Sequence, residues 1–275
     1  MASSTIYHAR SISLPSRPHP VAEQLDEQLN RLRSSQCTST SSSVSHSLND
    51  LTDLYTSVDE FLQLSLNQQT LSHNQNAIDQ VLDASLRLLD ICSSSRDALQ
   101  QSRELLQDVQ SALRRRCSGE LSITSEATKY LNTSRSVKKG IKKCQKNLKP
   151  TTELKEEANA TVTLLKDVQA MTADTLKFVV SYIAGSQKSG WSVVAKLINK
   201  NNNEVATSSL FDDVDATLNS LICQKKSGIS SSQIENLTSQ ILKLETEIQD
   251  VDEALESLFR HLVKTRATLL NIVSY

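Results

Sequence analysis

The last forty or so residues carry an apolar repeat that constrains the fold more than any other feature of the chain. Between residues 234 and 272, apolar residues recur at alternating steps of three and four, with Thr265 as the one polar member. This spacing places them along one face of a long α-helix, as in a coiled coil. Ser232 and Glu235 have the spacing of an S-x-x-E capping box and predict where the helix begins. The members of this heptad seam are Ile234, Leu237, Ile241, Leu244, Ile248, Val251, Leu255, Leu258, Leu262, Thr265, Leu269 and Ile272.

A helix of this length needs a partner along its seam. Packing against other helices of the same chain is the simpler interpretation, because their apolar stripes need partners too. Pairing with a second chain, as a homodimer through the C-terminal heptads, is the alternative.

The scarcity of turn-forming residues extends this argument to the whole chain. The 275 residues include only 5 glycines and 4 prolines, against averages of roughly 7% and 5%. A many-stranded β protein needs residues in its hairpins that tolerate positive φ, so a chain this poor in glycine favours few, long elements. We therefore predict the all-α class.

Apolar periodicity divides the chain into further helices. We predict an elongated antiparallel helical bundle of five to seven helices, as a single domain over residues 21–275, with residues 1–20 as a disordered basic tail and residues 34–45 as a Ser-rich linker. Thr151 or Thr152 is the expected cap of the helix that follows Pro150. Eight stretches have helical periodicity, of which five to seven are expected to form the bundle: residues 21–33, 44–62, 76–116, 120–148, about 152–184, 191–198, about 212–225 and 232–272.

Catalytic and metal-binding motifs are not found in the sequence. It contains no Gly-rich phosphate loop, no dinucleotide fingerprint and no nucleophile elbow, and its 5 histidines are scattered. The 5 cysteines form no C-x-x-C pair, which favours reduced thiols in a cytosol-like compartment. We predict a non-enzymatic cytoplasmic protein without a cofactor or metal. The most apolar run, residues 178–185, is too short to cross a bilayer.

The segment R-S-I-S-L-P in the tail suggests a partner. Arg10, Ser11, Ser13 and Pro15 have the spacing of a phosphoserine peptide of the kind that 14-3-3 proteins bind. Phosphorylated Ser13 would be held as a dianion by an arginine cluster of the partner. These four residues form the candidate phospho-docking peptide.

The same region supports a competing interpretation. Residues 1–22 contain arginine and several hydroxyl residues, and the first acidic residue is Glu23. This composition is typical of a plastid transit peptide, which import would remove together with the docking peptide. Plastid localisation is therefore the alternative to a cytoplasmic one.

A basic stretch lies in the middle of the chain, since no acidic residue occurs between Glu126 and Glu153. A helix here would place Lys138, Lys142, Lys146 and Lys149 on one face, which we take as a candidate site for anionic lipid or a partner protein. The structural alternative is a solvated face, partly neutralised by the acidic residues between Glu245 and Glu256. Nucleic acid is the weakest candidate, because no aromatic residue is interleaved for base stacking.

Several blocks of the sequence, in their order, resemble the plant-specific Bypass-like family. They are HARSISLPSRPHP near the start, LDEQLNRLRSS at 25–35, SVKKGIKKCQKNLK at 136–149, SGWSVVAKLINK at 189–200, and the heptad helix that ends the chain. The resemblance implies a regulator of root and shoot development. It implies no enzymatic activity and provides no catalytic residues to carry over.

Overall fold

The computed structural model describes residues 19–35, 43–115, 120–146, 159–185, 209–223 and 230–274. Every element within these ranges is an α-helix, which confirms the all-α class. The tail up to residue 18, the centre of the Ser-rich linker and the predicted helix at 191–198 lie outside the described residues. The described helices are α1 (Pro20–Ser35), α2 (Ser43–Gln63), α3 (Ser65–Ser72), α4 (Gln75–Arg114), α5 (Glu120–Gln145), α6 (Ala160–Ala184), α8 (Leu210–Cys223) and α9 (Ser231–Ser274).

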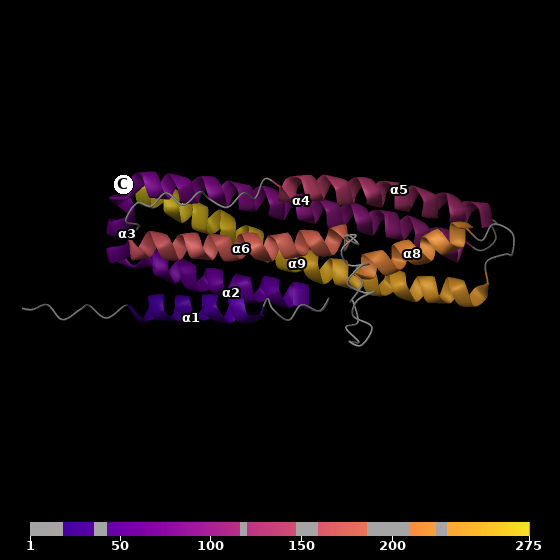
Figure 1. Ribbon diagram of the computed structural model, residues 1–275, viewed down its shortest axis with the longest axis horizontal. Coiled ribbons are helices and arrows are strands. Elements are labelled where there is room, and N and C mark those ends of the chain that lie inside the picture. The colour runs from indigo at the N-terminus through magenta and orange to yellow at the C-terminus, as the bar shows by residue number, and fades with distance from the viewer. Residues whose placement is uncertain are drawn as a thin grey trace, which may run out of the picture.

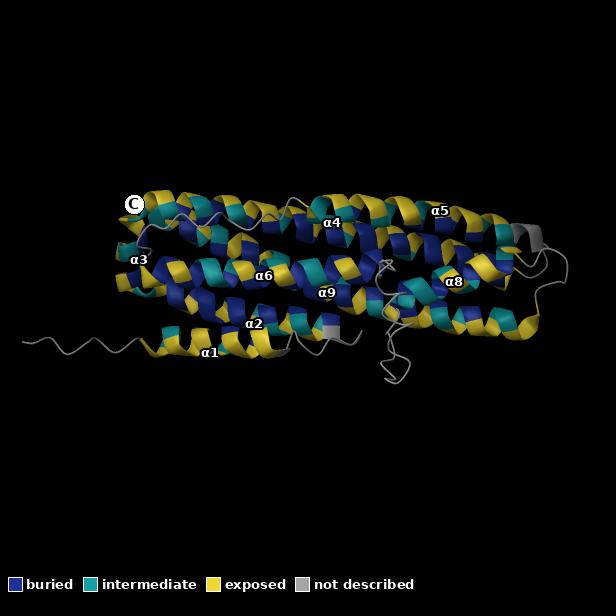
Figure 2. Ribbon diagram, in the orientation of Figure 1, coloured by how far each residue is buried: buried dark blue, intermediate teal, exposed yellow. Residues whose placement is uncertain are grey.

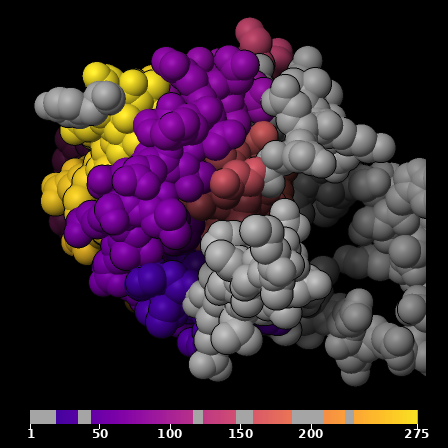
Figure 3. Space-filling model, turned by 90° about the vertical axis from the view of Figure 1, so that its left-hand side faces the viewer, coloured from indigo at the N-terminus to yellow at the C-terminus, as the bar shows by residue number. Residues whose placement is uncertain are grey.

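Two long antiparallel helices, α4 and α9, run through the whole body (Figure 1). They have 40 and 44 residues, which corresponds to about 60 and 66 Å. At one end α2 and α6 complete a four-helix arrangement with them, and at the other end α5 and α8 do so. We call these ends the α2–α6 half and the α5–α8 half. Figure 3 shows the α2–α6 half end-on. The last turns of α9 (yellow) lie there beside helices from the first part of the chain (purple).

The heptad seam of α9 is buried inside the chain. Its members from Leu237 to Leu269 are at most 8% exposed, Thr265 being the most exposed of them. They pack against α2, α3 and α8 as well as α4, and Figure 2 shows the buried residues facing the interior along both long helices. The long C-terminal helix was therefore predicted correctly, and its seam is filled by other helices of the chain.

Helix α1 lies on the outside of the α2–α6 half. Its apolar residues Leu25, Leu29 and Leu32 are spaced at steps of four and three, and each is at most 4% exposed. They pack it against α2 and α6. One ion pair, 3.4 Å between Arg33 and Asp167, adds an exposed contact to this apolar interface.

Two predicted helix starts are wrong. Helix α6 begins at Ala160 instead of after Thr151 or Thr152, because the Asn159 side chain accepts a 3.0 Å hydrogen bond from the Thr161 amide and caps it. The cap of helix α9 is Ser230, two residues before the expected Ser232, and the helix begins at Ser231. Ser230 Oγ accepts from the Gln233 amide, and Gln233 Oε1 accepts from the Ser230 amide, so the box is S-x-x-Q.

The short helix α3 was not predicted, because its glutamine- and asparagine-rich sequence has no apolar period. Leu64 separates α3 from α2, because its backbone dihedrals are extended (φ −67°, ψ 124°). Buried Asn67 then donates a 2.8 Å hydrogen bond to the Phe61 carbonyl at the end of α2. This bond satisfies an acceptor that the end of α2 leaves open.

Candidate functional site

The predicted basic face of α5 is divided in the structure. Lys138 is only 15% exposed, and its Nζ lies 2.7 Å from Asp215 Oδ2 and 3.5 Å from Asp212 Oδ1, both on α8. Lys142 is half-buried and Lys146 is exposed. Lys149 lies outside the described residues, as do Arg10, Ser11, Ser13 and Pro15. Lys138 therefore joins two helices instead of facing solvent with the other lysines.

The basic surface that remains on α5 can attract another molecule only through its charge. Lys139, Lys143 and Lys146 are exposed. The apolar side of the same helix is occupied, because Ile141 is 3% exposed and Val137 and Cys144 pack against the core. With that side buried, α5 cannot lie in a membrane as an amphipathic helix and could bind anionic lipid only through charge.

Three of the acidic residues of α9 that the sequence offered as counter-charges to the lysines of α5 bind other helices. Asp252 and Glu256 both pair with Arg96 of α4, the former at 2.9 Å. Glu247 instead accepts a hydrogen bond from the Tyr182 hydroxyl of α6. Burial raises the pKa of the Glu247 carboxyl, and the hydrogen bond from Tyr182 opposes this shift.

The α6–α8 junction explains how Asp212 reaches Lys138. The rings of Tyr182 and Phe211 meet edge-to-face with centroids 5.6 Å apart. Ser209 Oγ donates a 3.1 Å hydrogen bond to the Tyr182 carbonyl. Gly185 has a φ of 71°, and a Cβ atom there would lie 2.2 Å from Asp212 Oδ1. A residue with a side chain does not fit here at this φ. Glycine therefore allows the start of α8 to lie against the end of α6.

A buried phenol lies beside this ion pair. Tyr130 of α5 is 1% exposed, and its hydroxyl lies beside the Asp215 carboxylate and the Ser134 side chain. Burial, followed by the charge of Asp215, raises the pKa of Tyr130 well above its usual range. The phenol is therefore neutral at physiological pH, and the cluster of Tyr130, Lys138, Asp212 and Asp215 holds α5 against α8.

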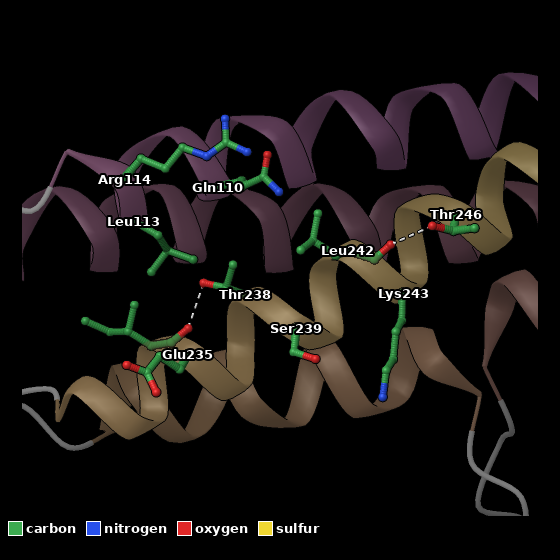
Figure 4. Close-up of a pocket in the computed structure, with 10 residues that line it drawn as sticks. Gln110, Leu113, Arg114, Glu235, Thr238, Ser239, Leu242, Lys243 and Thr246 are labelled. Carbon is green, nitrogen blue, oxygen red and sulfur yellow. Dashed lines mark hydrogen bonds between the residues drawn. The ribbon is translucent and has the colours of Figure 1, made fainter.

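A groove lies between α4 and α9 in the α5–α8 half (Figure 4). We call it the α4–α9 groove. Its volume is about 580 Å³. Leu242 of α9 is 49% exposed and points toward α4 on the side of Gln110, and Thr238 lies one turn before it on α9. The lining residues are Gln110, Leu113 and Arg114 of α4, and Ile234, Glu235, Thr238, Ser239, Leu242, Lys243 and Thr246 of α9.

The sequence interpretation missed this groove, although it contains one signal. Leu242 directly follows seam residue Ile241 and therefore points away from the core. An apolar residue out of register on an otherwise polar face is the kind of residue that contact surfaces expose.

The described residues contain no group of histidine, cysteine, aspartate and glutamate side chains that could hold a metal ion. None of the described helices has the length and apolarity required to cross a membrane.

Comparison with known proteins gives one match. The family model described as "Protein BPS1" matches residues 47–272. The matched range begins within α2 and ends within α9, so it includes α5 and the α4–α9 groove and leaves out α1. No curated protein and no solved structure matches the chain.

Proposed function

The chain belongs to the family of Protein BPS1, a Bypass-like plant family, and from this membership we propose that it is a non-enzymatic adaptor in root and shoot development. The family implies a regulatory role in development. The adaptor activity, its docking peptide and its location in the cell are our proposals.

The use of charged groups in the described helices supports an adaptor. An enzyme site needs polar groups that converge on a space where a substrate fits. Here the inward-facing charges pair across helices instead, as Arg96 does with Asp252 and Lys138 with Asp215. In the α2–α6 half, Asp59 likewise pairs with Lys264 at 2.9 Å. Such pairs specify which helices pack together. Because these charges are used for packing, we assign binding of other proteins to the surface of the molecule.

The tail supplies the proposed docking peptide. Phosphorylation of Ser13, between Arg10 and Pro15, creates the dianion that a 14-3-3-type protein binds through arginines. The peptide ends shortly before α1, which Leu25 and Leu29 hold against the body. A partner bound at Ser13 would therefore be kept close to the helical body.

Binding of phosphorylated full-length protein to a 14-3-3 protein tests the proposal. We expect binding that disappears in Ser13→Ala and persists in the matched control Ser11→Ala. Equal retention of the Ser13→Ala and unmodified proteins would contradict it. Sequencing the N-terminus of the mature protein then distinguishes a cytoplasmic adaptor, which keeps residues 1–22, from a plastid protein, which loses them.

The exposed lysines of α5 favour a second candidate, electrostatic binding to anionic lipid. Each lysine close to such a surface contributes up to about 1 kcal/mol. Co-sedimentation with phosphatidylserine vesicles should fall when Lys139, Lys143 and Lys146 are all changed to Glu. The matched control reverses three exposed cations on other helices, Arg31, Arg87 and Arg260. Equal loss in both variants would exclude α5 as the binding site.

A further inference from the structure

We propose that the α4–α9 groove is the contact surface of a homodimer, in which the α9 helices of two copies cross antiparallel at Ser239. The second copy would bind to the side of α9 opposite the heptad seam, since the seam is buried by the chain's own helices.

The groove exposes an apolar surface that another molecule can cover. Leu242 of α9 is 49% exposed and lines the groove together with Ile234 of α9 and Leu113 of α4. Large apolar side chains exposed side by side are typical of contact surfaces. The groove therefore has an apolar reason to be covered.

The hydroxyls along the groove are largely satisfied within α9. Thr238 donates a 2.7 Å hydrogen bond to the Ile234 carbonyl, and Thr246 donates a 3.0 Å hydrogen bond to the Leu242 carbonyl (Figure 4). These side chains place little demand on a partner, so Leu242 and the small Ser239 allow close approach of another helix.

The charges on this side of α9 are complementary to a second copy of themselves. Glu235 and Lys243 are exposed and form no ion pair among the described residues. They lie four residues before and four residues after Ser239, about 12 Å apart along the helix. A two-fold axis through Ser239 places each Glu235 opposite the Lys243 of the other copy. The contact is thus isologous, with both charge pairs made by one symmetry operation.

Symmetry around the same axis also matches the remaining side chains. Thr246 falls opposite Ser232 of the other copy, and Leu242 falls opposite Asn236. None of these positions brings like charges together or opposes two bulky residues. Ser232, Ser239 and Thr246 lie seven residues apart, so small side chains follow the line of contact along α9.

Charge exchange tests the proposal in the full-length chain. Sedimentation velocity of the unchanged protein from about 1 to 100 μM should show a monomer–dimer equilibrium, as expected for an interface of modest size. Glu235→Lys alone and Lys243→Glu alone should each raise the dissociation constant by about tenfold or more, because two attractive pairs become repulsive.

The decisive step mixes the two single variants. The E235K variant is basic at both positions and the K243E variant is acidic at both, so each self-associates poorly but the two should form a mixed dimer. The double variant E235K/K243E should dimerise again, since the symmetry restores both pairs. Lys139→Glu on α5 is the matched control and should leave dimerisation unchanged. Circular dichroism of each variant confirms that it is folded.

Three results would overturn the proposal. The first is an unchanged protein that stays monomeric over the whole concentration range. The second is dimerisation that the single variants leave intact, and the third is failure of the two single variants to associate when mixed. Protection of the groove by a segment of the same chain would appear as the first result.

Discussion

The two halves of the body share the same two long helices but differ in the helices that cover them and in the contacts that join them. In the α2–α6 half, α1 covers the outside, and the apolar contacts are joined by side-chain hydrogen bonds between helices, such as those of 3.0 Å between Tyr55 and Thr172 and 3.3 Å between Thr161 and Asn67. The α5–α8 half has no described helix in the place of α1. Its helices pack through buried residues such as Val214 and Leu218, are joined by the Lys138 ion pairs, and leave the α4–α9 groove open.

This difference suggests a division of labour. The α2–α6 half buries its surfaces within the chain and is expected to be the more stable part, because burial of apolar area is the main stabilising term. The α5–α8 half keeps charge on α5 and an open groove on α9, so it is the half where binding to other molecules is expected.

The largest effect is expected from removing one buried leucine in each half. Leu54 of α2 and Leu218 of α8 are both 0% exposed. Leu54→Ala should cost about 4 kcal/mol and Leu218→Ala about 2 kcal/mol, because the short helix α8 can shift to fill the space whereas α2 is confined beneath α1. Urea unfolding measures both. A larger loss for Leu218→Ala would contradict the ranking of the halves.

An intermediate effect is expected for the ion pairs. Lys138→Met leaves Asp212 and Asp215 without their cation in a partly buried site and should cost about 2 kcal/mol. In the other half, Lys264→Met should cost less than about 1 kcal/mol, because its side chain is 63% exposed and Asp59 keeps its contact with Thr265.

Thermal and urea unfolding of these variants should be compared with Lys139→Met, a change of the same kind at an exposed position. Equal stability of the Lys138→Met and Lys139→Met proteins would mean that the α5–α8 half does not depend on its charges.

The smallest effect is expected from removing one phenol hydroxyl in each half. Tyr55→Phe loses a buried hydrogen bond to Thr172, which itself donates to the Val168 carbonyl, and should cost about 1 kcal/mol. Tyr130→Phe removes a buried hydroxyl that lies beside Asp215 and Ser134 without a close hydrogen bond to either, and should cost less than Tyr55→Phe. Unfolding midpoints measure the pair, and a clear loss for Tyr130→Phe would reveal a bond to that hydroxyl.

The sequence predicted what depends on periodicity and missed what depends on neighbours. The seam of α9 and the extent of α2 and α4 follow from apolar spacing, and all were predicted within two residues. The pairing of Lys138 with Asp215 was not predictable, because it requires knowing that α5 and α8 are adjacent. The α9 start was misplaced because two overlapping S-x-x-E and S-x-x-Q patterns compete, and only the geometry at Ser230 decides between them.

The candidate site shows the same limit. Lysines at helical spacing predicted a basic face on α5, yet one of them turned inward toward α8. The groove depends on two helices that are more than a hundred residues apart in sequence, so only Leu242, out of register, gave any sign of it.

Hydrogen exchange of the full-length protein at two concentrations tests most directly the claim that the α5–α8 half carries the binding surface. One concentration should lie below and one above the monomer–dimer midpoint. We predict slower exchange at the higher concentration in peptides covering residues 106–114 and 232–246, and no change in α1, α2 and α3. Protection confined to α1–α3, or exchange that is independent of concentration throughout, would contradict the account.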